Sequence, residues 1–445
     1  MTTSQSKTSY RPAFAIDSLL NFITQLLIFA FSLVSSIIIA RSLGPAGKGL
    51  YSFLILLPTL IATVINMGIN SANVYFIGQK TFSVHKILTN AFFYSILVGS
   101  GFAIILVLST VLYNIISLKN FPIFYILMVS PMIILLLIID NINYTFLAHR
   151  QIMIFSLIRF LRVFIYVFIL IWFYFFSSLS VLQAIVANII GLLFATLLGA
   201  FFLNKRIYLR KVGFDILIFK EIIGFGYKQH LGSIFQFLNY RVDMFIVLAL
   251  LSQGDLGLYS ISVIIAETVW YLPNSIGQIL YAKISSEKNE LANKFTPLVC
   301  RTIIILIMFC CVIIYALSDI IIPVLFSSSF SASVLPLKLL LPGVIFLSIS
   351  KIIGSDLSGR GFPQYSTIAS GVSLIVTVIF DLLFIPIYGI NGAAVASSLS
   401  YMANAVVILH FFKRTSGIPL RDTLFLKFHD FLEYKRILVS LKPSL

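Results

Sequence analysis

The stretch Gly257–Gln278, GLYSISVIIAETVWYLPNSIGQ, repeats a stretch near the N-terminus, Gly49–Asn70. Both copies open with Gly-Leu-Tyr-Ser, and the offset from residue 49 to residue 257 is 208 residues in a chain of 445. At this offset the polar residues Thr59, Thr63, Asn66 and Asn70 fall on Glu267, Tyr271, Asn274 and Gln278. Their spacing puts each set on one face of a helix. We therefore predict two related halves, each with a polar stripe along an apolar helix.

The composition is that of a membrane protein. Hydrophobic residues make up 60% of the chain and charged residues 10%, and the mean hydropathy is +1.05. A soluble core cannot bury so much apolar surface. Because a helical span needs about 20 apolar residues, the charged and turn-forming breaks divide the chain into about twelve spans. We expect an all-α polytopic membrane protein with two six-helix bundles, related by a pseudo-twofold axis along the membrane normal.

The basic residues set the expected orientation. The formal net charge is +16, from 31 lysines and arginines against 15 acidic residues. With a cytoplasmic N-terminus, 21 of the 31 fall on the cytoplasmic side and three, Arg41, Lys48 and Lys119, on the other side. The positive-inside rule therefore predicts that both termini of this multi-pass protein are cytoplasmic. Because the basic residues are explained by the orientation of the chain in the membrane, we expect no nucleic-acid partner.

Three regions are predicted along the chain. A basic, polar segment over residues 204–220 is the longest connection between spans and is expected to link the halves. The N-terminal bundle then covers residues 1–210 and the C-terminal bundle residues 211–420. Residues 421–445 interleave apolar and basic side chains, which predicts an amphipathic cytoplasmic tail that rests on the membrane surface.

Three charged residues lie deep inside predicted spans, namely Arg241, Asp243 and Glu267. A charge at the centre of a span costs about 2.5 to 3.5 kcal/mol on insertion scales. The three either line a solvated transport cavity or form an ion pair between helices. Arg241 and Asp243 face nearly opposite sides of a helix, so Glu267 is the candidate partner of Arg241. A carboxylate in low dielectric also exchanges protons or holds Na⁺, so Asp243 and Glu267 are the candidates for ion coupling.

Other charged residues are interpreted by their depth in the predicted spans. Lys338, Lys351 and Asp381 are predicted to anchor the chain at the membrane interface. Asp140 lies near the middle of its span, and its sequence position leaves open whether it pairs with a neighbouring helix.

Amides, hydroxyls and cations inside spans suit a water-filled cavity that recognises a polar, hydroxyl-rich or anionic solute. Arginine, in particular, binds phosphate through two parallel hydrogen bonds. The candidate substrate-binding residues on the predicted spans are Asn66, Asn70, Arg159, Arg162, Lys228, Gln229, Gln236, Arg241, Asn274 and Gln278. For Arg159, Arg162 and Lys228, cavity lining and a reach to the interface both remain open.

No catalytic constellation is present in the sequence. There is no P-loop GxxxxGK[ST], no HExxH and no extramembrane loop large enough to carry a hydrolase or glycosyltransferase site. Cys300, Cys310 and Cys311 all lie in one predicted span, which suits neither a disulfide framework nor a CxxC metal site. We therefore expect a protein that is not an enzyme and that has no metal site.

Several short motifs occur in a recognisable order: Ala40–Pro45 followed by Gly49–Ser52, Tyr240–Asp243 with Gly257–Ser260, then Gly359–Gly361 and Ile385–Ala394. On these motifs the chain resembles the polysaccharide flippases over roughly residues 14–412. These proteins belong to the multidrug/oligosaccharidyl-lipid/polysaccharide exporter superfamily.

The resemblance implies two bundles around a V-shaped cavity that opens alternately to either side of the membrane. It implies transfer of an undecaprenyl-pyrophosphate-linked oligosaccharide from the cytoplasmic to the outer leaflet, for surface polysaccharide biosynthesis. The cavity of such proteins is cationic, which places Arg41, Lys228 and Arg241 near the pyrophosphate. The expected partners are the lipid-linked oligosaccharide, membrane lipids and other polysaccharide-assembly proteins. A monomer in a bacterial or archaeal cytoplasmic membrane is expected, coupled to H⁺ or Na⁺ and without another cofactor.

Two alternatives remain. A multidrug/cation antiporter of the same fold would have a smaller cavity with dominant acidic residues, whereas basic residues slightly outnumber acidic ones in the deep set. A membrane glycan polymerase or ligase would need a large catalytic outer loop, and the predicted outer loops are short.

Overall fold

The structure, a computed structural model, describes residues 10–117, 122–207, 213–286, 289–425 and 427. Helices account for nearly all of these residues, and no strand occurs among them. The chain divides into two compact units, Met1–Phe237 and Leu238–Leu445. The division falls inside a helix, and the predicted domain boundary at residues 210 and 211 stays a prediction.

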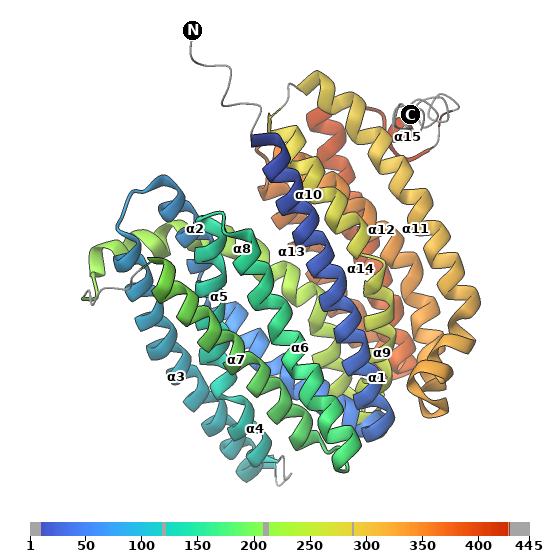
Figure 1. The fold of residues 1–445 in the computed structure, drawn as a ribbon. Coiled ribbons are helices and arrows are strands. Elements are labelled where there is room, and N and C mark those ends of the chain that lie inside the picture. The colour runs from blue at the N-terminus through green and yellow to red at the C-terminus, as the bar shows by residue number, and fades with distance from the viewer. Residues whose placement is uncertain (1–9, 118–121, 208–212, 287–288, 426, 428–445) are drawn as a thin grey trace, which may run out of the picture. The chain divides into compact units, whose positions relative to one another are not determined.

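The N-terminal unit holds the helices α1 (Tyr10–Ile65), α2 (Ile69–Gln79), α3 (Val84–Ser117), α4 (Ile123–Val129), α5 (Pro131–Ala148), α6 (Ile152–Phe176) and α7 (Val181–Ile207), and the first part of α8 (Ile216–Leu250) (Figure 1). The C-terminal unit holds the rest of α8, then α9 (Gln253–Thr268), α10 (Tyr271–Ser286), α11 (Asn289–Phe326), the 3₁₀ helix η1 (Ser328–Ser333), α12 (Val334–Gly359), α13 (Gln364–Tyr388), α14 (Ile390–Ser416) and α15 (Leu420–Leu424).

The spans confirm the predicted all-α multi-pass fold. In the described part of the chain, ten helices are long and apolar enough to cross a membrane, or eleven when the bent pair α9 and α10 counts as one span. One of the ten, Leu20–Ile65, has 46 residues. As a straight helix it would measure about 69 Å, against a hydrocarbon core of about 30 Å. It is divided at Gly44, whose φ of 65° and ψ of −175° are not helical. Counted as two spans, it brings the total in the described residues to eleven, or to twelve with the α9 and α10 pair, against the about twelve that the sequence predicts.

The two polar stripes do not lie on continuous helices, contrary to the prediction from their spacing. The chain turns at Met67 and Gly68, with φ of 52° and 75°, so that Asn70 lies on α2 while Thr59 and Thr63 lie on α1. In the second copy, α9 and α10 are bent by 43° between Glu267 and Tyr271. Residues at this spacing share one face only on an unbroken helix, and each break redirects the side chains beyond it.

Two glycines allow the start of α2 to lie directly against α8. A Cβ atom on Gly68 would overlap the carbonyl of Gly226, and one on Gly226 would lie 2.7 Å from the Gly68 carbonyl. One turn further along α8, Nε2 of His230 lies 3.2 Å from the carbonyl oxygen of Val64. Ile222 joins the buried cluster of α2 and α3. The first part of α8 is therefore part of the N-terminal core.

The residues just before α8 are fixed to α3. Asn90 donates from Nδ2 to the carbonyl of Asp215 at 3.0 Å and accepts the Asp215 N–H at 2.9 Å. Lys86 donates to the Asp215 carboxylate at 3.0 Å, and this hydrogen bond holds the pKa of that carboxyl below its ordinary value. Residues 208–212 of the predicted linker and most of the predicted tail, residue 426 and residues 428–445, lie outside the described residues.

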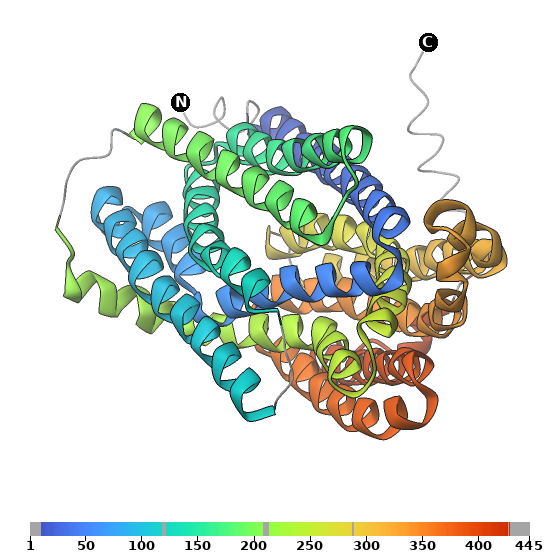
Figure 2. The same ribbon diagram turned by 90° about the horizontal axis from the view of Figure 1, so that it is seen from below.

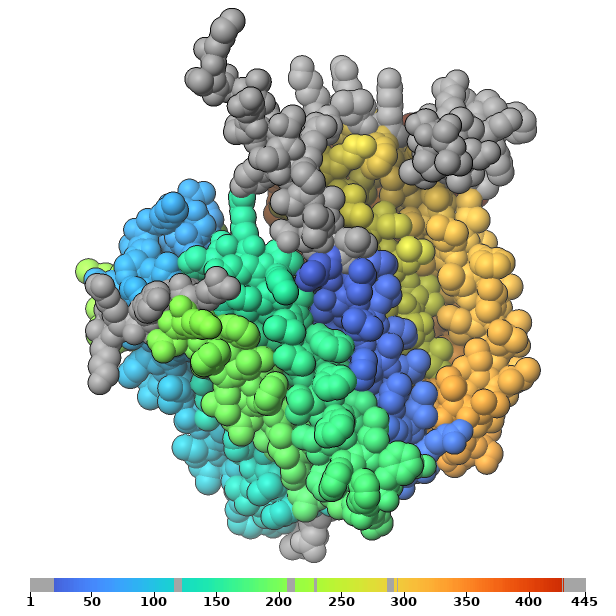
Figure 3. Space-filling model, viewed as in Figure 1, coloured from blue at the N-terminus to red at the C-terminus, as the bar shows by residue number. Residues whose placement is uncertain are grey.

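Each unit packs through close helix contacts. In the N-terminal unit, α6 lies between α1 and α7 (Figure 3). In the C-terminal unit, α14 packs along both α12 and α13 (Figure 2). A Cβ on Gly343 would lie 2.5 Å from the Cα of Ser398, and the Ser398 hydroxyl donates to the Leu339 carbonyl at 2.6 Å. The absence of a side chain at Gly343 therefore lets α12 and α14 meet.

Candidate functional site

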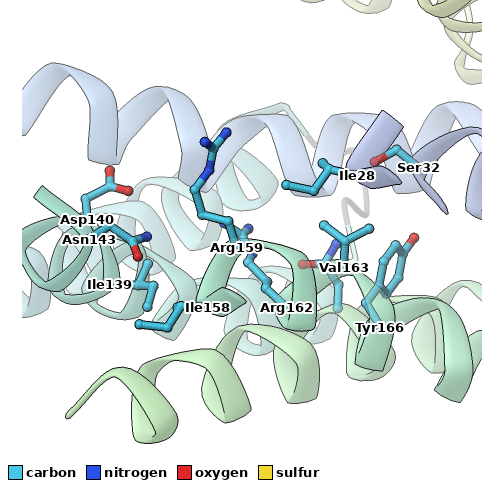
Figure 4. A pocket seen from close by; sticks show the side chains of 11 residues that line it. Ile28, Ser32, Ile139, Asp140, Asn143, Ile158, Arg159, Arg162, Val163 and Tyr166 are labelled. Carbon is cyan, nitrogen blue, oxygen red and sulfur yellow. The ribbon is translucent and has the colours of Figure 1, made fainter. Parts of the chain in front are cut away.

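A polar pocket of about 330 Å³ lies within the N-terminal unit, among α1, α5, α6 and α7. Figure 4 shows Asp140 at one end of it and Tyr166 at the other, with Arg159 and Arg162 between them. The pocket is lined by Ile28, Ser32, Ile139, Asp140, Asn143, Ile158, Arg159, Arg162, Val163, Tyr166 and Asn188. Its charged residues all lie on helices that qualify as membrane spans. Polar groups at this depth in a span mark functional sites more often than structural ones.

The charges in the pocket interact but do not cancel. Asp140 interacts electrostatically with Arg162 and Arg159 and accepts a hydrogen bond from Asn70. The guanidinium of Arg159 also lies 5.0 Å from the ring centre of Phe155. Two arginines against one aspartate leave one net positive charge. The pocket therefore offers guanidinium donors to an anionic group and amides to a hydroxyl-rich one.

A neutral hydrogen-bond network closes the Tyr166 end of the pocket. The hydroxyls of Tyr166 and Tyr51 are hydrogen-bonded at 2.7 Å, and Asn188 donates to the Tyr51 hydroxyl at 3.1 Å. A Cβ on Gly191 would lie 2.7 Å from the Arg162 carbonyl. The close approach of α7 to α6 at this glycine brings Asn188 to the tyrosine pair.

The predicted pairing of Arg241 with Glu267 is confirmed in the C-terminal unit. The guanidinium donates to both carboxylate oxygens, from Nη1 at 2.5 Å and from Nη2 at 2.9 Å, and Nη1 also donates to the carbonyl of Tyr240 at 3.0 Å. The two side chains are 27% and 21% exposed. Glu267 therefore accepts hydrogen bonds from Nη1 and Nη2 of Arg241, which are donors that a phosphate would also need.

The second acidic residue of α8, Asp243, lies in a buried hydroxyl cluster. It accepts hydrogen bonds from the Met244 N–H at 2.7 Å, the Tyr259 hydroxyl at 2.6 Å and the Ser397 hydroxyl at 3.2 Å. Asp381 of α13 interacts electrostatically with it. Two buried carboxylates that repel each other electrostatically can be stabilised by a bound proton or cation.

The anchoring role predicted for Asp381 is wrong. Its side chain is fully buried, and in the described part of the chain neither carboxylate oxygen has a hydrogen-bond partner. The residue lies on the same buried face of α13 as Ser370, Ser373 and Thr377. Its distance from the end of the span predicts a position at the membrane interface. The side chain is instead buried because it lies on the face of α13 that packs against neighbouring helices.

The structure places the other predicted site residues as follows. Asn66 is buried at the turn that ends α1, and Asn70 donates a hydrogen bond to Asp140, which lines the pocket. Exposed positions are occupied by Arg41, Gln236, Asn274 and Gln278. The side chains of Lys228 and Gln229 lie outside the described residues. The role of all these residues in binding stays a prediction.

Sequence reasoning did not select several residues of these networks, although one signal was available. Tyr51 and Tyr259 are the tyrosines of the repeated Gly-Leu-Tyr-Ser motif, and each anchors the polar network of its own unit. Tyr166 and Asn188 carry no comparable signal, because isolated polar residues in apolar spans do not identify their partners.

Comparison with solved structures shows the fold. An inward-facing multidrug resistance transporter of the MATE family and the MOP superfamily superposes with a TM-score of 0.73 at 14% identity, over 90% of this chain and 98% of that chain. The lipid II flippase MurJ in an inward closed conformation superposes with a TM-score of 0.72 at 17% identity, over 96% of this chain and 94% of that chain. At these identities the likeness shows that the chain shares the two-bundle fold.

Comparison with curated sequences finds relatives that match less than half of this chain. A Haloferax volcanii protein named "Probable low-salt glycan biosynthesis flippase Agl15" is 25% identical over 198 residues, which are 42% of this chain and 41% of that protein. The capsular polysaccharide biosynthesis protein CapF of Staphylococcus aureus is 26% identical over 208 residues, or 45% of this chain and 52% of that protein. The chain thus matches about half the length of these relatives.

The family is shown by a match over most of the chain. Residues 38–335 match the sequence model described as polysaccharide biosynthesis protein. This range includes the Arg241 to Glu267 pair and every lining residue of the pocket except Ile28 and Ser32. The chain therefore belongs to the polysaccharide biosynthesis protein family.

Proposed function

We propose that this protein is a secondary transporter that flips an undecaprenyl-pyrophosphate-linked oligosaccharide from the cytoplasmic to the outer leaflet by alternating access. The observation that carries the proposal is the pocket of the N-terminal unit. It places Arg159 and Arg162 on a membrane-spanning helix beside the amides Asn143 and Asn188. Cations suit a pyrophosphate and amides suit sugar hydroxyls. The names of the curated relatives support a glycan-assembly role.

The test is deletion of the gene followed by lipid extraction. Cells that lack the protein should accumulate lipid-linked oligosaccharide in the inner leaflet and lose surface glycan. The double variant Arg159→Gln/Arg162→Gln should restore less than about a tenth of the flux, since one lost charged hydrogen bond already costs about 1.5 to 3 kcal/mol. Lys205→Gln is the matched control, because Lys205 is exposed at the end of α7. Normal glycan in the deletion strain would refute the proposal.

The alternative is a multidrug/cation antiporter of the same fold. The acidic pair Asp243 and Asp381 favours it, since buried carboxylates suit a cationic cargo as well as a coupling ion. An antiporter predicts that the deletion strain becomes hypersensitive to cationic dyes while its surface glycan stays normal. The two functions therefore give opposite results in the same strain.

We infer that H⁺ or Na⁺ drives the transport cycle through Asp243 together with Asp381. Glu267, the other candidate from the sequence, is engaged on both oxygens by Arg241, whereas neither oxygen of Asp381 has a partner in the described residues. Asp243→Asn and Asp381→Asn should each abolish transport driven by an imposed ion gradient in proteoliposomes. Asp319→Asn is the control, since Asp319 is exposed and pairs with Lys338. Unchanged gradient dependence in both test variants would contradict the assignment.

We further propose that the protein works as a monomer in a bacterial or archaeal cytoplasmic membrane, with both termini in the cytoplasm, beside other polysaccharide-assembly proteins. The asymmetry of basic residues between the two sides supports this orientation. Reporter fusions at the two termini test it, and light scattering in detergent tests the oligomeric state.

A further inference from the structure

Lys351 does not reach for the membrane interface as its position in the sequence predicted. It lies on α12, and its ammonium is held against aromatic rings within the C-terminal unit. Nζ lies 5.2 Å from the ring centre of Tyr240 and 5.0 Å from that of Trp270. The two rings are 5.1 Å apart, and Tyr401 packs edge-on against Trp270 at 5.6 Å. The aromatic platform of Tyr240, Trp270 and Tyr401 thus fixes the position of one cation.

The charge of Lys351 differs from the charges of Arg241 and Lys338 because, among the described residues, no carboxylate neutralises it. Arg241, the next residue after Tyr240, is paired with Glu267. Lys338, on the same helix as Lys351, is paired with Asp319 at 2.6 Å. In the described part of the chain, no carboxylate lies within ion-pair distance of Lys351. A cation–π contact compensates only part of the cost of a charge in a span.

The platform also holds a second polar group without a partner. Nε1 of Trp270 is buried and finds no acceptor in the residues that the structure describes. An indole N–H can only donate, and buried donors are almost always satisfied. A lysine without a carboxylate and an indole N–H without an acceptor therefore occur on one ring, and both are groups that an anionic oxygen satisfies.

We propose that Lys351, held on the platform of Tyr240, Trp270 and Tyr401, is the phosphate contact of the C-terminal unit. This role rests on the proposed function in taking the diphosphate of a lipid-linked oligosaccharide as the physiological ligand. It replaces Arg241, which the sequence suggested for this task and which is occupied by Glu267. The chemistry recognised is a phosphate or diphosphate group, either on a polyprenyl lipid or free in water.

Trp270 itself provides the readout, because the chain has two tryptophans. The other, Trp172, lies on α6 and is 54% exposed, far in sequence from the platform. The variant Trp172→Phe leaves Trp270 as the only indole. Polyprenyl diphosphate added to this variant in lipid nanodiscs should change its fluorescence saturably, whereas the neutral polyprenol should not.

Removal of the lysine charge should remove the response. In the Trp172→Phe background, Lys351→Gln should weaken the apparent affinity for polyprenyl diphosphate at least tenfold, and Lys351→Arg should keep it within about threefold. Lys338→Gln is the matched control, since Lys338 also lies over a ring, that of Tyr315 at 5.1 Å, but is paired with a carboxylate. If Lys351→Gln does not fold, Lys351→Met keeps the apolar stem and serves instead.

The outcomes separate the ligand sources and the two proposals. A response to inorganic pyrophosphate as well as to the lipid supports a site for the phosphate group alone, and a response to the lipid only supports a lipid headgroup site. An equal response to the neutral polyprenol, or no loss of affinity in the uncharged Lys351 variants, overturns the role of Lys351. If deletion of the gene leaves surface glycan normal while Trp270 still responds, the flippase proposal fails and the phosphate site stands.

Discussion

Arg241 and Glu267 show how two charges can be kept inside a membrane-spanning unit. Either residue alone would leave a charge in a poorly solvated place, but the bidentate pair satisfies both, with N–O distances of 2.5 and 2.9 Å. Their side chains remain about a quarter exposed, at 27% and 21%. The pair therefore neutralises two charges within the C-terminal unit, and its loss should first lower the stability of the protein.

The variant Arg241→Ala should destabilise the protein by about 3 kcal/mol, because it leaves the Glu267 carboxylate without its partner. The double variant Arg241→Ala/Glu267→Ala should recover part of that loss, since it removes both charges. Thermal unfolding in detergent measures the difference.

The control for this prediction is Lys86→Ala. Lys86 and Asp215 form a solvent-exposed ion pair, with side chains 43% and 26% exposed, and such pairs contribute little to stability because water screens the charges. Equal losses of stability in Arg241→Ala and Lys86→Ala would contradict the larger contribution expected from the Arg241 to Glu267 pair.

The repeated tyrosine shows where the two halves differ in chemistry. Tyr51 bonds to Tyr166 and Asn188, which are neutral, whereas Tyr259 bonds to the carboxylate of Asp243. The same motif residue therefore anchors a neutral network in one unit and an acidic network in the other. The sequence repeat predicts the position of the anchor, but the partners come from other helices and are set by packing.

At the scale of single elements, the contact between α2 and α8 depends on two residues without side chains. Gly68 and Gly226 lie so close that a Cβ on either would overlap the backbone of the other element. Gly68 also has a φ of 75°, which glycine adopts without strain. The turn at Met67 and Gly68 and the position of α8 in the N-terminal core are thus determined together.

The variant Gly226→Ala should lower the free energy of unfolding by about 1 to 3 kcal/mol, because the added methyl group forces the helices apart. Gly224→Ala is the matched control on the same helix, since its Cβ would meet nothing within 4 Å. That control should be neutral or stabilise by up to about 1 kcal/mol, as alanine favours the helix.

Thermal unfolding of the two alanine variants side by side tests this contact. If Gly226→Ala is as stable as Gly224→Ala, the helices can separate without cost and the glycine contact is not a determinant of the fold.

For the helices in general, the sequence predicts that a membrane span is present better than it predicts whether the helix is unbroken. The ten or eleven helices of the described residues that could cross a membrane follow from hydropathy alone, because a helical span needs about 20 apolar residues. The breaks at Gly44, at Met67 and between α9 and α10 do not follow from hydropathy. Two of them depend on local backbone conformation, the positive φ at Gly44 and at Met67, and the spacing of polar residues does not predict which way side chains face beyond such a break.

For the whole molecule, composition and the repeat were sufficient to predict an all-α membrane protein of two related halves. The site was predictable only in part. Charges inside spans singled out Arg159, Arg162, Arg241, Asp243 and Glu267, because burial of a charge needs a reason, and their role in binding or coupling stays a prediction. The roles of Lys351 and Asp381 were misjudged, because depth along a helix was used without knowledge of which face is packed.

One helix places a geometric condition on the N-terminal unit. α8 is unbroken along its first part, where Gly226 lies against the backbone of Gly68 and His230 lies 3.2 Å from the carbonyl oxygen of Val64. Deletion of a single residue between Gly226 and His230 would turn one of them by about 100° relative to the other and shift it by about 1.5 Å. The number of residues between the two contacts therefore sets the rotational phase of the helix against the turn at Gly68. Relatives that keep both contacts must keep that number, even where they keep little else of the sequence.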